Sequence, residues 1–245
     1  MVKRLLKKII PPEAALQVRK IKGRILYRGN KVYCPVCDYR SSKFLTIPGH
    51  TRLICPVCYS LQRHRLLSLY WQEATKLFDA PVKRLLHIAP EPCFYNLFRK
   101  HPQIDYHSAD LDSIWANIKA DVTELPFEDS SFDVIICNHV LEHVPDDRKA
   151  MSEFYRVLAP GGWATLQVPV VRETTFEDEN VTTPAERLAV FGQADHVRIY
   201  GKDYFDRLKE AGFNVETTKA SSILTKEQIT DMALHEVEDV IIAKK

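Results

Sequence analysis

Two periodicities organise the hydrophobic and polar residues between positions 120 and 170. Residues 132–137 form a short, nearly continuous apolar run, typical of a strand covered on both faces of a parallel sheet. Four apolar residues then recur at helical spacing and predict a helix with one buried stripe: Met151, Phe154, Tyr155 and Leu158. Pro160 and the two glycines after it are expected to end that helix. Residues 163–168 are apolar again and predict the next strand.

The same periodicities predict strands and helices on both sides of residues 120–170. Apolar runs predict further strands at residues 84–88, 104–108, 213–218 and 237–243. Helical spacing predicts one helix over residues 61–78 and another from Tyr204 to Ala211, closed by Gly212. Strands that alternate with helices indicate a doubly wound α/β domain.

Polar residues follow two of the predicted strands. Asn138 and His139 follow the strand 132–137, and Asp110, with Leu111 and Asp112, follows the strand 104–108. The carboxyl ends of strands border the ligand crevice in open α/β sheets, where an acid can accept both hydroxyls of a ribose. An acid after a strand is also a common cap, and Asp121 could likewise be the N-cap of a short helix.

The motifs of this region are dense, and they resemble a known family. They read Ala-Asp-Val-Thr-Glu-Leu-Pro-Phe (120–127), Phe-Asp (132–133), Leu-Glu-His (141–143) and Arg-Val-Leu-Ala-Pro-Gly-Gly (156–162). This run resembles the class I S-adenosylmethionine-dependent methyltransferases, in the type 11-like branch. The resemblance covers about residues 82–245. It implies a seven-stranded, mostly parallel Rossmann-like sheet and a methyltransferase that uses S-adenosyl-L-methionine.

The resemblance also assigns expected roles to single residues. Asp110 aligns with the acid that binds the ribose, and Asp121 with Val122 aligns with the pair that reads adenine. Leu111 and Asn138 complete the expected cofactor contacts. If the acceptor needs a base, His139 is the first candidate and His196 the second, because histidine titrates near neutrality. Glu142 and His143 are interpreted mainly as helix-start and packing residues.

The loop after the opening strand departs from the family. The usual acidic-x-Gly-x-Gly-x-Gly loop is replaced by residues 87–93, His-Ile-Ala-Pro-Glu-Pro-Cys. His87 takes the acidic position, and the three glycine positions are taken by Ala89, Glu91 and Cys93. The two prolines stiffen the turn. Either the loop has lost cofactor binding, or it binds the cofactor differently, with Glu91 facing the methionine ammonium group. The departure argues against a nicotinamide dehydrogenase.

Two Cys-Pro-Val-Cys pairs precede this domain, at Cys34, Cys37, Cys55 and Cys58. Four thiolates in two close pairs match the tetrahedral shell that Zn²⁺ prefers, and a filled shell makes the site structural. A redox dithiol or two unrelated buried pairs are the alternatives. The pattern resembles a zinc ribbon of the kind attached to many enzymes.

Charge is concentrated at the N-terminus. Residues 1–31 hold ten lysines and arginines and one acid, Glu13, although the whole chain carries a formal net charge of only +2. Residues 2–10 predict a short basic amphipathic helix that packs on the body, lies on an anionic membrane surface or contacts phosphates. No apolar run reaches the roughly 20 residues of a membrane span. We therefore expect a cytoplasmic protein, with peripheral contact at the inner membrane surface as a further expectation.

The expected organisation is linear. A basic helical arm (1–30), a zinc ribbon (31–62) and a connecting helix (63–81) precede the methyltransferase domain (82–245), whose insertion at 170–201 either covers the substrate or is a surface loop. Three functions follow. The first is a methyltransferase for a small-molecule or glycan-type acceptor. The second is an RNA methyltransferase that grips nucleic acid through residues 1–65. The third is a non-catalytic zinc-binding adaptor.

Overall fold

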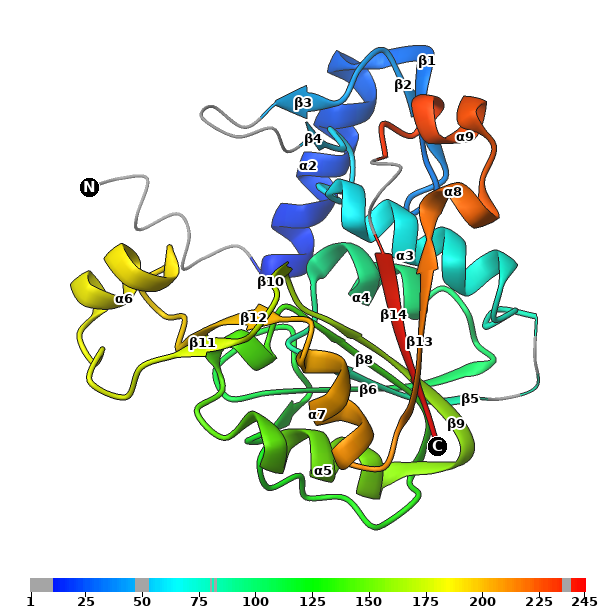
Figure 1. The fold of residues 1–245 in the computed structure, drawn as a ribbon. Coiled ribbons are helices and arrows are strands. Elements are labelled where there is room, and N and C mark those ends of the chain that lie inside the picture. The colour runs from blue at the N-terminus through cyan, green and yellow to red at the C-terminus, as the bar shows by residue number, and fades with distance from the viewer. Residues whose placement is uncertain (1–10, 47–52, 80, 82, 235–238) are drawn as a thin grey trace. The chain divides into compact units, whose positions relative to one another are not determined.

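A computed structural model describes residues 11–46, 53–79, 81, 83–234 and 239–245 (Figure 1). Contacts divide the chain into two units. The first comprises residues 1–79, 91–101 and 219–240, and the second comprises residues 80–90, 102–218 and 241–245. The basic segment 2–10, predicted to be helical, lies outside the described residues. Within the described part, no helix is both long enough and apolar enough to cross a bilayer.

The second unit is built on a seven-stranded sheet in the order β13–β14–β9–β8–β5–β6–β7. Its strands are β5 (Lys83–Ile88), β6 (Ile104–Asp110), β7 (Ile118–Lys119), β8 (Phe132–Asn138), β9 (Leu158–Gln167), β13 (Asn214–Lys219) and β14 (Asp239–Lys244). The pairs β5–β6, β6–β7, β5–β8 and β8–β9 are parallel, and β14 runs antiparallel to β9. The predicted mostly parallel, Rossmann-like sheet is confirmed.

This order places a topological switch point beside β5. The chain passes from β5 outward through β6 to β7, and then returns to the other side of β5 as β8. Four central residues of β8, from Val134 to Cys137, are at most 1% exposed, as expected of a strand covered on both faces. Ligands of open α/β sheets bind outside the carboxyl ends of the strands at such a point.

The core of the second unit lies between the sheet and two helices, α5 (Asp147–Val157) and α7 (Tyr204–Glu210). Met151 and Phe154 from α5 and Leu208 from α7 are fully buried. Of the predicted stripe on α5, Met151 and Phe154 are confirmed, whereas Tyr155 is half-buried and Leu158 belongs to β9. The expected helix end at Pro160 is wrong by three residues. Leu158 already has an extended backbone, and β9 begins there because Phe132 of β8 pairs with it.

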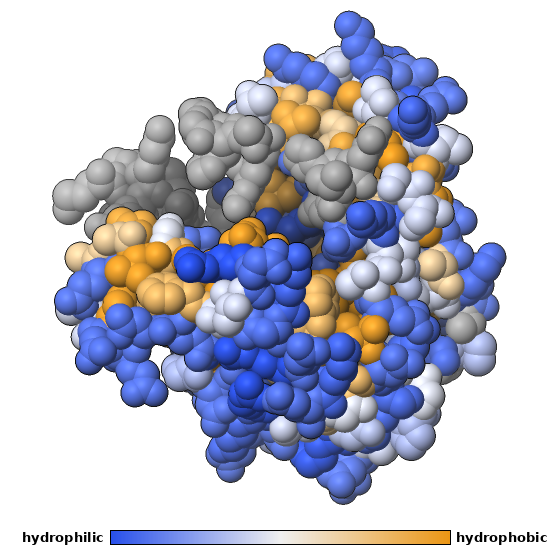
Figure 2. All heavy atoms as spheres, viewed as in Figure 1, coloured by the Kyte–Doolittle hydropathy of each residue, from blue (hydrophilic) through white to orange (hydrophobic). Residues whose placement is uncertain are grey.

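The segment 170–201 forms a small substructure of its own. A sheet in the order β10–β12–β11 joins β10 (Val170–Arg172), β11 (Phe176–Glu177) and β12 (Arg198–Gly201). Helix α6 (Pro184–Phe191) begins with a capping box between Thr183 and Glu186 and ends at Gly192 in the left-handed conformation. Figure 2 shows hydrophobic residues gathered over α6, where Leu188 is 56% exposed.

The first unit combines short strands and helices. They are α2 (Pro12–Leu26), β1 (Arg28–Cys34), β2 (Tyr39–Ser41), β3 (Leu45–Thr46), β4 (Leu53–Ile54), α3 (Gln62–Glu73), α4 (Pro92–Phe98), α8 (Ala220–Ile223) and α9 (Lys226–Asp231). The pairs β1–β2 and β3–β4 are antiparallel hairpins. Residues 91–101 and 219–240 therefore pack with the N-terminal part, an arrangement that the linear division of the sequence did not foresee.

Residues 63–65, Arg-His-Arg, form a basic cluster of the kind that usually lies on a solvated face. Its central part is buried instead. Arg65 is 0% exposed, and its guanidinium donates to the carbonyl oxygens of Leu53, Ser60, Met232 and Ala233. It also lies over the ring of Phe44, 4.0 Å from the centroid. Arg65 thus ties three segments of the first unit together.

Candidate functional site

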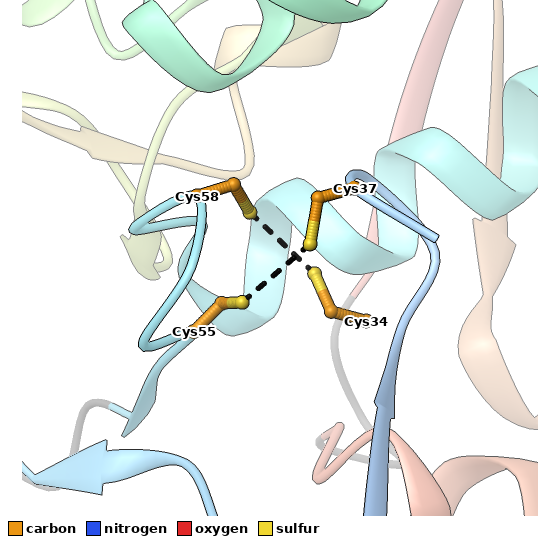
Figure 3. Close-up of side chains that lie close together, drawn as sticks. All are labelled: Cys34, Cys37, Cys55 and Cys58. Carbon is orange, nitrogen blue, oxygen red and sulfur yellow. Dashed lines mark hydrogen bonds between the residues drawn. The ribbon is translucent and has the colours of Figure 1, made fainter. Parts of the chain in front are cut away.

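The four cysteines of the two Cys-Pro-Val-Cys pairs converge in the first unit (Figure 3). Cys34 Sγ lies 3.6 Å from Cys58 Sγ, Cys37 Sγ lies 3.8 Å from Cys55 Sγ, and all four sulfurs lie within 4.8 Å of one another. A tetrahedral Zn²⁺ with bonds of about 2.3 Å holds its sulfurs about 3.8 Å apart. The four thiols therefore fit a zinc ion in spacing and in chemistry.

The two turns that carry these cysteines share one backbone shape. Asp38 and Tyr59, which directly follow the second cysteine of each pair, both adopt a positive φ, of 49° and 63°. Helix α2 packs directly on the second turn, because a Cβ added at Gly23 would lie 2.1 Å from the carbonyl oxygen of Pro56. The cluster is therefore built from repeated turns and supported by a closely packed helix.

A second group of residues lies at the carboxyl edge of the central sheet. Ala89 directly follows β5 and has φ of +47°, in the left-handed region that favours glycine. Its N–H donates to the carbonyl of Ala109, and the N–H of Ala120 donates to the carbonyl of Asp110. These bonds hold the ends of β5, β6 and β7 together at the switch point.

Asp110 and Asp121 both use one carboxylate oxygen to shape their own loops. Oδ1 of Asp110 accepts from the backbone N–H groups of Asp112 and Ser113, at 2.8 and 2.6 Å. Oδ1 of Asp121 accepts from the N–H and the hydroxyl of Thr123, which lowers the pKa of Asp121. In the described part of the chain, Oδ2 of each carboxylate has no hydrogen-bond donor, and so it can accept from a ligand.

The other expected cofactor residues lie in different settings. Val122 is buried, whereas Leu111 is 52% exposed beside Asp110. His87 lies within β5, fully buried, and its Nδ1 is 3.1 Å from the hydroxyl of Tyr106. Glu91 is the N-cap of α4 in the first unit, where its Oε1 lies 3.6 Å from His64 Nε2. Their roles in cofactor binding stay predictions.

The end of β8 carries the expected catalytic residues. Asn138 is the last residue of the strand and is buried, and His139 follows it with φ of +55°. The short helix η1 (Leu141–His143) comes next, and His139 Nδ1 lies 3.2 Å from Glu142 Oε1. His196, from the segment 170–201, lies against this helix, with its ring centroid 4.6 Å from that of His143. Both candidate bases therefore belong to one cluster.

Arg198 holds the segment around His196 on η1. Its guanidinium donates to the carbonyl oxygens of Leu141, Val144 and Pro145, and the N–H of Val197 donates to the carbonyl of Glu142 at 2.9 Å. Burial and the neighbouring His143 lower the pKa of His196. Its imidazole is therefore neutral at pH 7 and able to accept a proton or to bind a cation.

Sequence reasoning missed Glu142 and His143 as members of this cluster. Glu142 is 2% exposed, and its carboxylate lies 3.2 Å from His139 Nδ1 and close to His143 and His196. The signal was present in the sequence, because His139, Glu142 and His143 stand at the spacing of one helical turn. Only the fold brings His196 to them.

Comparison with known proteins finds a similarity within the second unit. Residues 81–166 match the type 11 family model described as "Methyltransferase domain". About a third of the chain is therefore similar to this family. The match includes Ala89, Asp110, Asp121, Asn138 and the η1 helix, and so it confirms over these residues the resemblance inferred from the sequence.

Individual relatives match parts of the chain. A demethylmenaquinone methyltransferase of Clavibacter sepedonicus is 43% identical over 61 residues, which cover 22% of this chain and 25% of that protein. A ubiquinone/menaquinone biosynthesis C-methyltransferase, UbiE, of Brucella canis is 32% identical over 111 residues, or 39% of this chain and 41% of the relative. The chain thus spans less than half the length of either relative.

Solved structures show similarity over a longer part of the chain at lower identity. The crystal structure of a SAM-dependent methyltransferase from Archaeoglobus fulgidus is 17% identical, with a TM-score of 0.47, over 74% of this chain and 93% of that one. The YcgJ protein from Bacillus subtilis is also 17% identical, with a TM-score of 0.48, over 74% and 99% of the two chains.

Proposed function

We propose that the protein is an S-adenosylmethionine-dependent methyltransferase that acts on a small-molecule or glycan-type acceptor. The observation that carries the proposal is the arrangement of Asp110 and Asp121 at the switch point of a matched methyltransferase domain, each with Oδ2 free to accept within the described chain. The bound cofactor would supply an activated methyl group on sulfur. The protein would contribute orientation and the exclusion of water.

The glycine-free loop is compatible with this proposal. A glycine is useful after the first strand because it adopts positive φ without strain and lets a ligand approach the backbone. Ala89 already has the positive φ, of +47°, and its side chain adds only a methyl group. The backbone shape that glycine usually provides is therefore present here without glycine.

Calorimetric titration with S-adenosylmethionine tests the proposal. We expect binding in the micromolar range by the wild-type protein, and at least about tenfold weaker binding by Asp110→Asn, because a carboxylate that accepts from a ribose is stronger than an amide. Asp105→Asn is the matched control, since Asp105 stands on the same strand near its opposite end and is exposed. If the wild-type protein does not bind S-adenosylmethionine, both methyltransferase functions are excluded and the non-catalytic adaptor remains.

The names of the relatives point to one kind of acceptor. The Clavibacter protein is named for demethylmenaquinone, a largely apolar quinone. Exposed Leu188 and Val190 on α6 and Val171 on β10 give the segment 170–201 an apolar character suited to such an acceptor. We propose that this segment covers the acceptor, and that His139 or His196 serves as base.

A second candidate is an RNA methyltransferase, favoured by the basic surface of α2. Arg19, Lys22, Arg24 and Arg28 are exposed on α2 and at the start of β1. Binding through phosphate contacts would weaken steeply with salt, because each contact releases counterions. RNA binding that is absent, or insensitive to salt, would exclude this candidate and leave the small-molecule acceptor.

We also propose that the four cysteines hold a structural Zn²⁺. Support comes from the sulfur spacings and from Ser60, which is fully buried with its Oγ 3.2 Å from both Cys34 Sγ and Cys58 Sγ. Four cysteine sulfurs, three of them on buried residues and one on the half-buried Cys37, would fill the shell and leave no position for a substrate. The metal would stabilise the fold of the first unit and take no part in the reaction.

Metal analysis tests the zinc proposal. Purified protein should carry about one Zn²⁺ that dialysis does not remove and that a mercurial thiol reagent releases. The double variant Cys34→Ser/Cys55→Ser should lose this ion and unfold at lower temperature, because structural zinc contributes directly to folding. Cys137→Ala, at a buried cysteine of β8 outside the cluster, should keep the ion. Retention of zinc by the double variant would exclude the site.

A further inference from the structure

A second cluster of metal-binding side chains lies outside the cysteine site, at the carboxyl end of β8. Glu142 and His143 from η1 and His196 from the segment 170–201 each offer one ligand atom, and these atoms lie within 4.8 Å of one another. All three belong to the second unit. Two imidazoles and one carboxylate are a common ligand set for divalent first-row transition metals.

The carboxylate of Glu142 is the strongest indication of a cation site. The residue is 2% exposed, and His139 Nδ1 is 3.2 Å from Oε1. Oε2 is buried and accepts no hydrogen bond from any residue that the structure describes. A buried carboxylate oxygen without a partner is costly, and a cation would compensate for the lost hydration.

His143 is oriented as a metal ligand would be. Its Nδ1 lies 3.2 Å from the carbonyl oxygen of Asp195, which can only accept, so the ring carries its proton on Nδ1. In the neutral form of this ring, the lone pair lies on Nε2. Histidine ligands of metals usually donate the other ring N–H to a carbonyl or a carboxylate in this way. The contacts of Arg198 with η1 keep His196 beside it.

We propose that Glu142, His143 and His196 bind a divalent transition-metal ion, with His139 as the hydrogen-bond partner of the carboxylate. Three protein ligands leave positions open for water or for an oxygen of a bound molecule. The site follows Asn138 directly, at the edge of the sheet where ligands bind. Resting on the proposed methyltransferase function, the inference specifies the acceptor as a molecule that binds through a hydroxyl or phenolic oxygen.

The test uses the full-length protein with its cysteine site loaded with zinc and excess metal removed. Mn²⁺ is then titrated and its binding is followed by electron paramagnetic resonance, because Mn²⁺ prefers nitrogen and oxygen ligands and binds too weakly to displace zinc from thiolates. Zn²⁺ is titrated in parallel by calorimetry. We expect about one further equivalent of each ion to bind, and Zn²⁺ to displace Mn²⁺.

Three variants probe the ligands. Glu142→Gln and His196→Ala should each weaken Mn²⁺ binding by well over tenfold, because each removes a proposed ligand. His139→Ala should weaken it by about tenfold, because His139 contacts the ligand Glu142 and not the metal itself. The double variant Asp105→Asn/His107→Ala is the matched control, since it removes an exposed histidine–carboxylate pair at 3.1 Å elsewhere in the same unit, and it should bind as wild type. Thermal unfolding of each variant shows whether it is folded.

Two results would overturn the inference: a wild-type protein that takes up neither ion beyond the cysteine-bound zinc, or folded Glu142→Gln and His196→Ala variants that bind Mn²⁺ as tightly as wild type. Titration of the same samples with S-adenosylmethionine separates this inference from the proposed function. Mn²⁺ binding without S-adenosylmethionine binding would refute the methyltransferase and keep the metal site. The reverse result would refute only the metal site.

Discussion

Ala89 and His139 both stand at strand ends that border the candidate cofactor site, and both have positive φ without being glycine. An L-residue pays about 1–2 kcal/mol for this conformation. Such strain persists where the surrounding structure imposes it, which is common at ligand sites. At Ala89 the constraint is visible, because its N–H is bonded to the carbonyl of Ala109 on the neighbouring strand.

Replacing Ala89 with glycine should stabilise the protein. Removal of the Cβ relieves the strain, and the greater freedom of glycine in the unfolded chain offsets about 0.4–1 kcal/mol of that gain. The net effect should be a rise in melting temperature of up to about 3 °C. Ala109→Gly, at a buried position inside β6, should lower the melting temperature instead. A fall on Ala89→Gly would contradict the account of this loop.

At the scale of the element, the segment 170–201 is held by a network of charges. Glu177 on β11 accepts from Arg198 on β12 at 2.8 Å and from Arg207 on α7 at 2.6 Å, and Asp147 of α5 accepts from Arg207 at 2.9 Å. Burial alone would raise the pKa of Glu177, but the two arginines outweigh it and lower the pKa below the ordinary value.

Glu177→Gln should therefore destabilise the protein in a pH-dependent way. A carboxylate with a lowered pKa in the folded state stabilises above its unfolded pKa, and the contribution is lost as the pH falls through the folded value. We expect Glu177→Gln to lower the free energy of unfolding by about 1 kcal/mol at pH 7. This difference between variant and wild type should shrink as the pH falls below about 4.5. Glu173→Gln, which breaks an exposed ion pair with Lys202 in the same segment, should have little effect. Thermal unfolding at pH 7 and pH 3 measures the effect of Glu177→Gln. Equal losses of stability at the two pH values would contradict the role of the Glu177 carboxylate beside Arg198 and Arg207.

Arg65 joins elements of the first unit that are far apart in the sequence. Its removal leaves the carbonyl oxygens of Ser60 and Met232, among others, without a strong donor in a buried place. We expect Arg65→Met to cost about 3 kcal/mol in the free energy of unfolding, measured by denaturant titration. Arg40→Met removes a bidentate but exposed pair with Asp231 and should cost less than about 1 kcal/mol. Similar costs for the two variants would contradict the structural role of Arg65.

For the molecule as a whole, local patterns were sufficient to predict six of the seven strands of the central sheet and the two cysteine turns. Periodicity identified β8 and the stripe of α5, and the spacing of the cysteines identified their cluster. The partners of Arg65 could not be predicted, because the carbonyl groups at Met232 and Ala233 come from a turn over 160 residues away. His196 reaches Glu142 only through the contacts of Arg198 with backbone carbonyls, which leave no pattern in the sequence.

The same argument explains the error at the end of α5. Pro160 was a reasonable helix end, but pairing of Leu158 with Phe132 starts the strand before the proline. There a non-local contact outweighed the local signal. The packing role expected of Glu142 and His143 stays a prediction, because both lie in the short helix η1 and Glu142 is buried.

The crystal structure of the protein bound to S-adenosylhomocysteine tests the central claim most directly. The account predicts that the adenosine lies at the carboxyl edge of β5, β6 and β7, with its ribose hydroxyls on Oδ2 of Asp110 and its adenine at Asp121 and Val122. The Asp110→Asn variant, crystallised under the same conditions, should bind the ligand weakly or not at all. A nucleoside bound elsewhere, or Pro90 filling this place at saturating ligand, would contradict the claim.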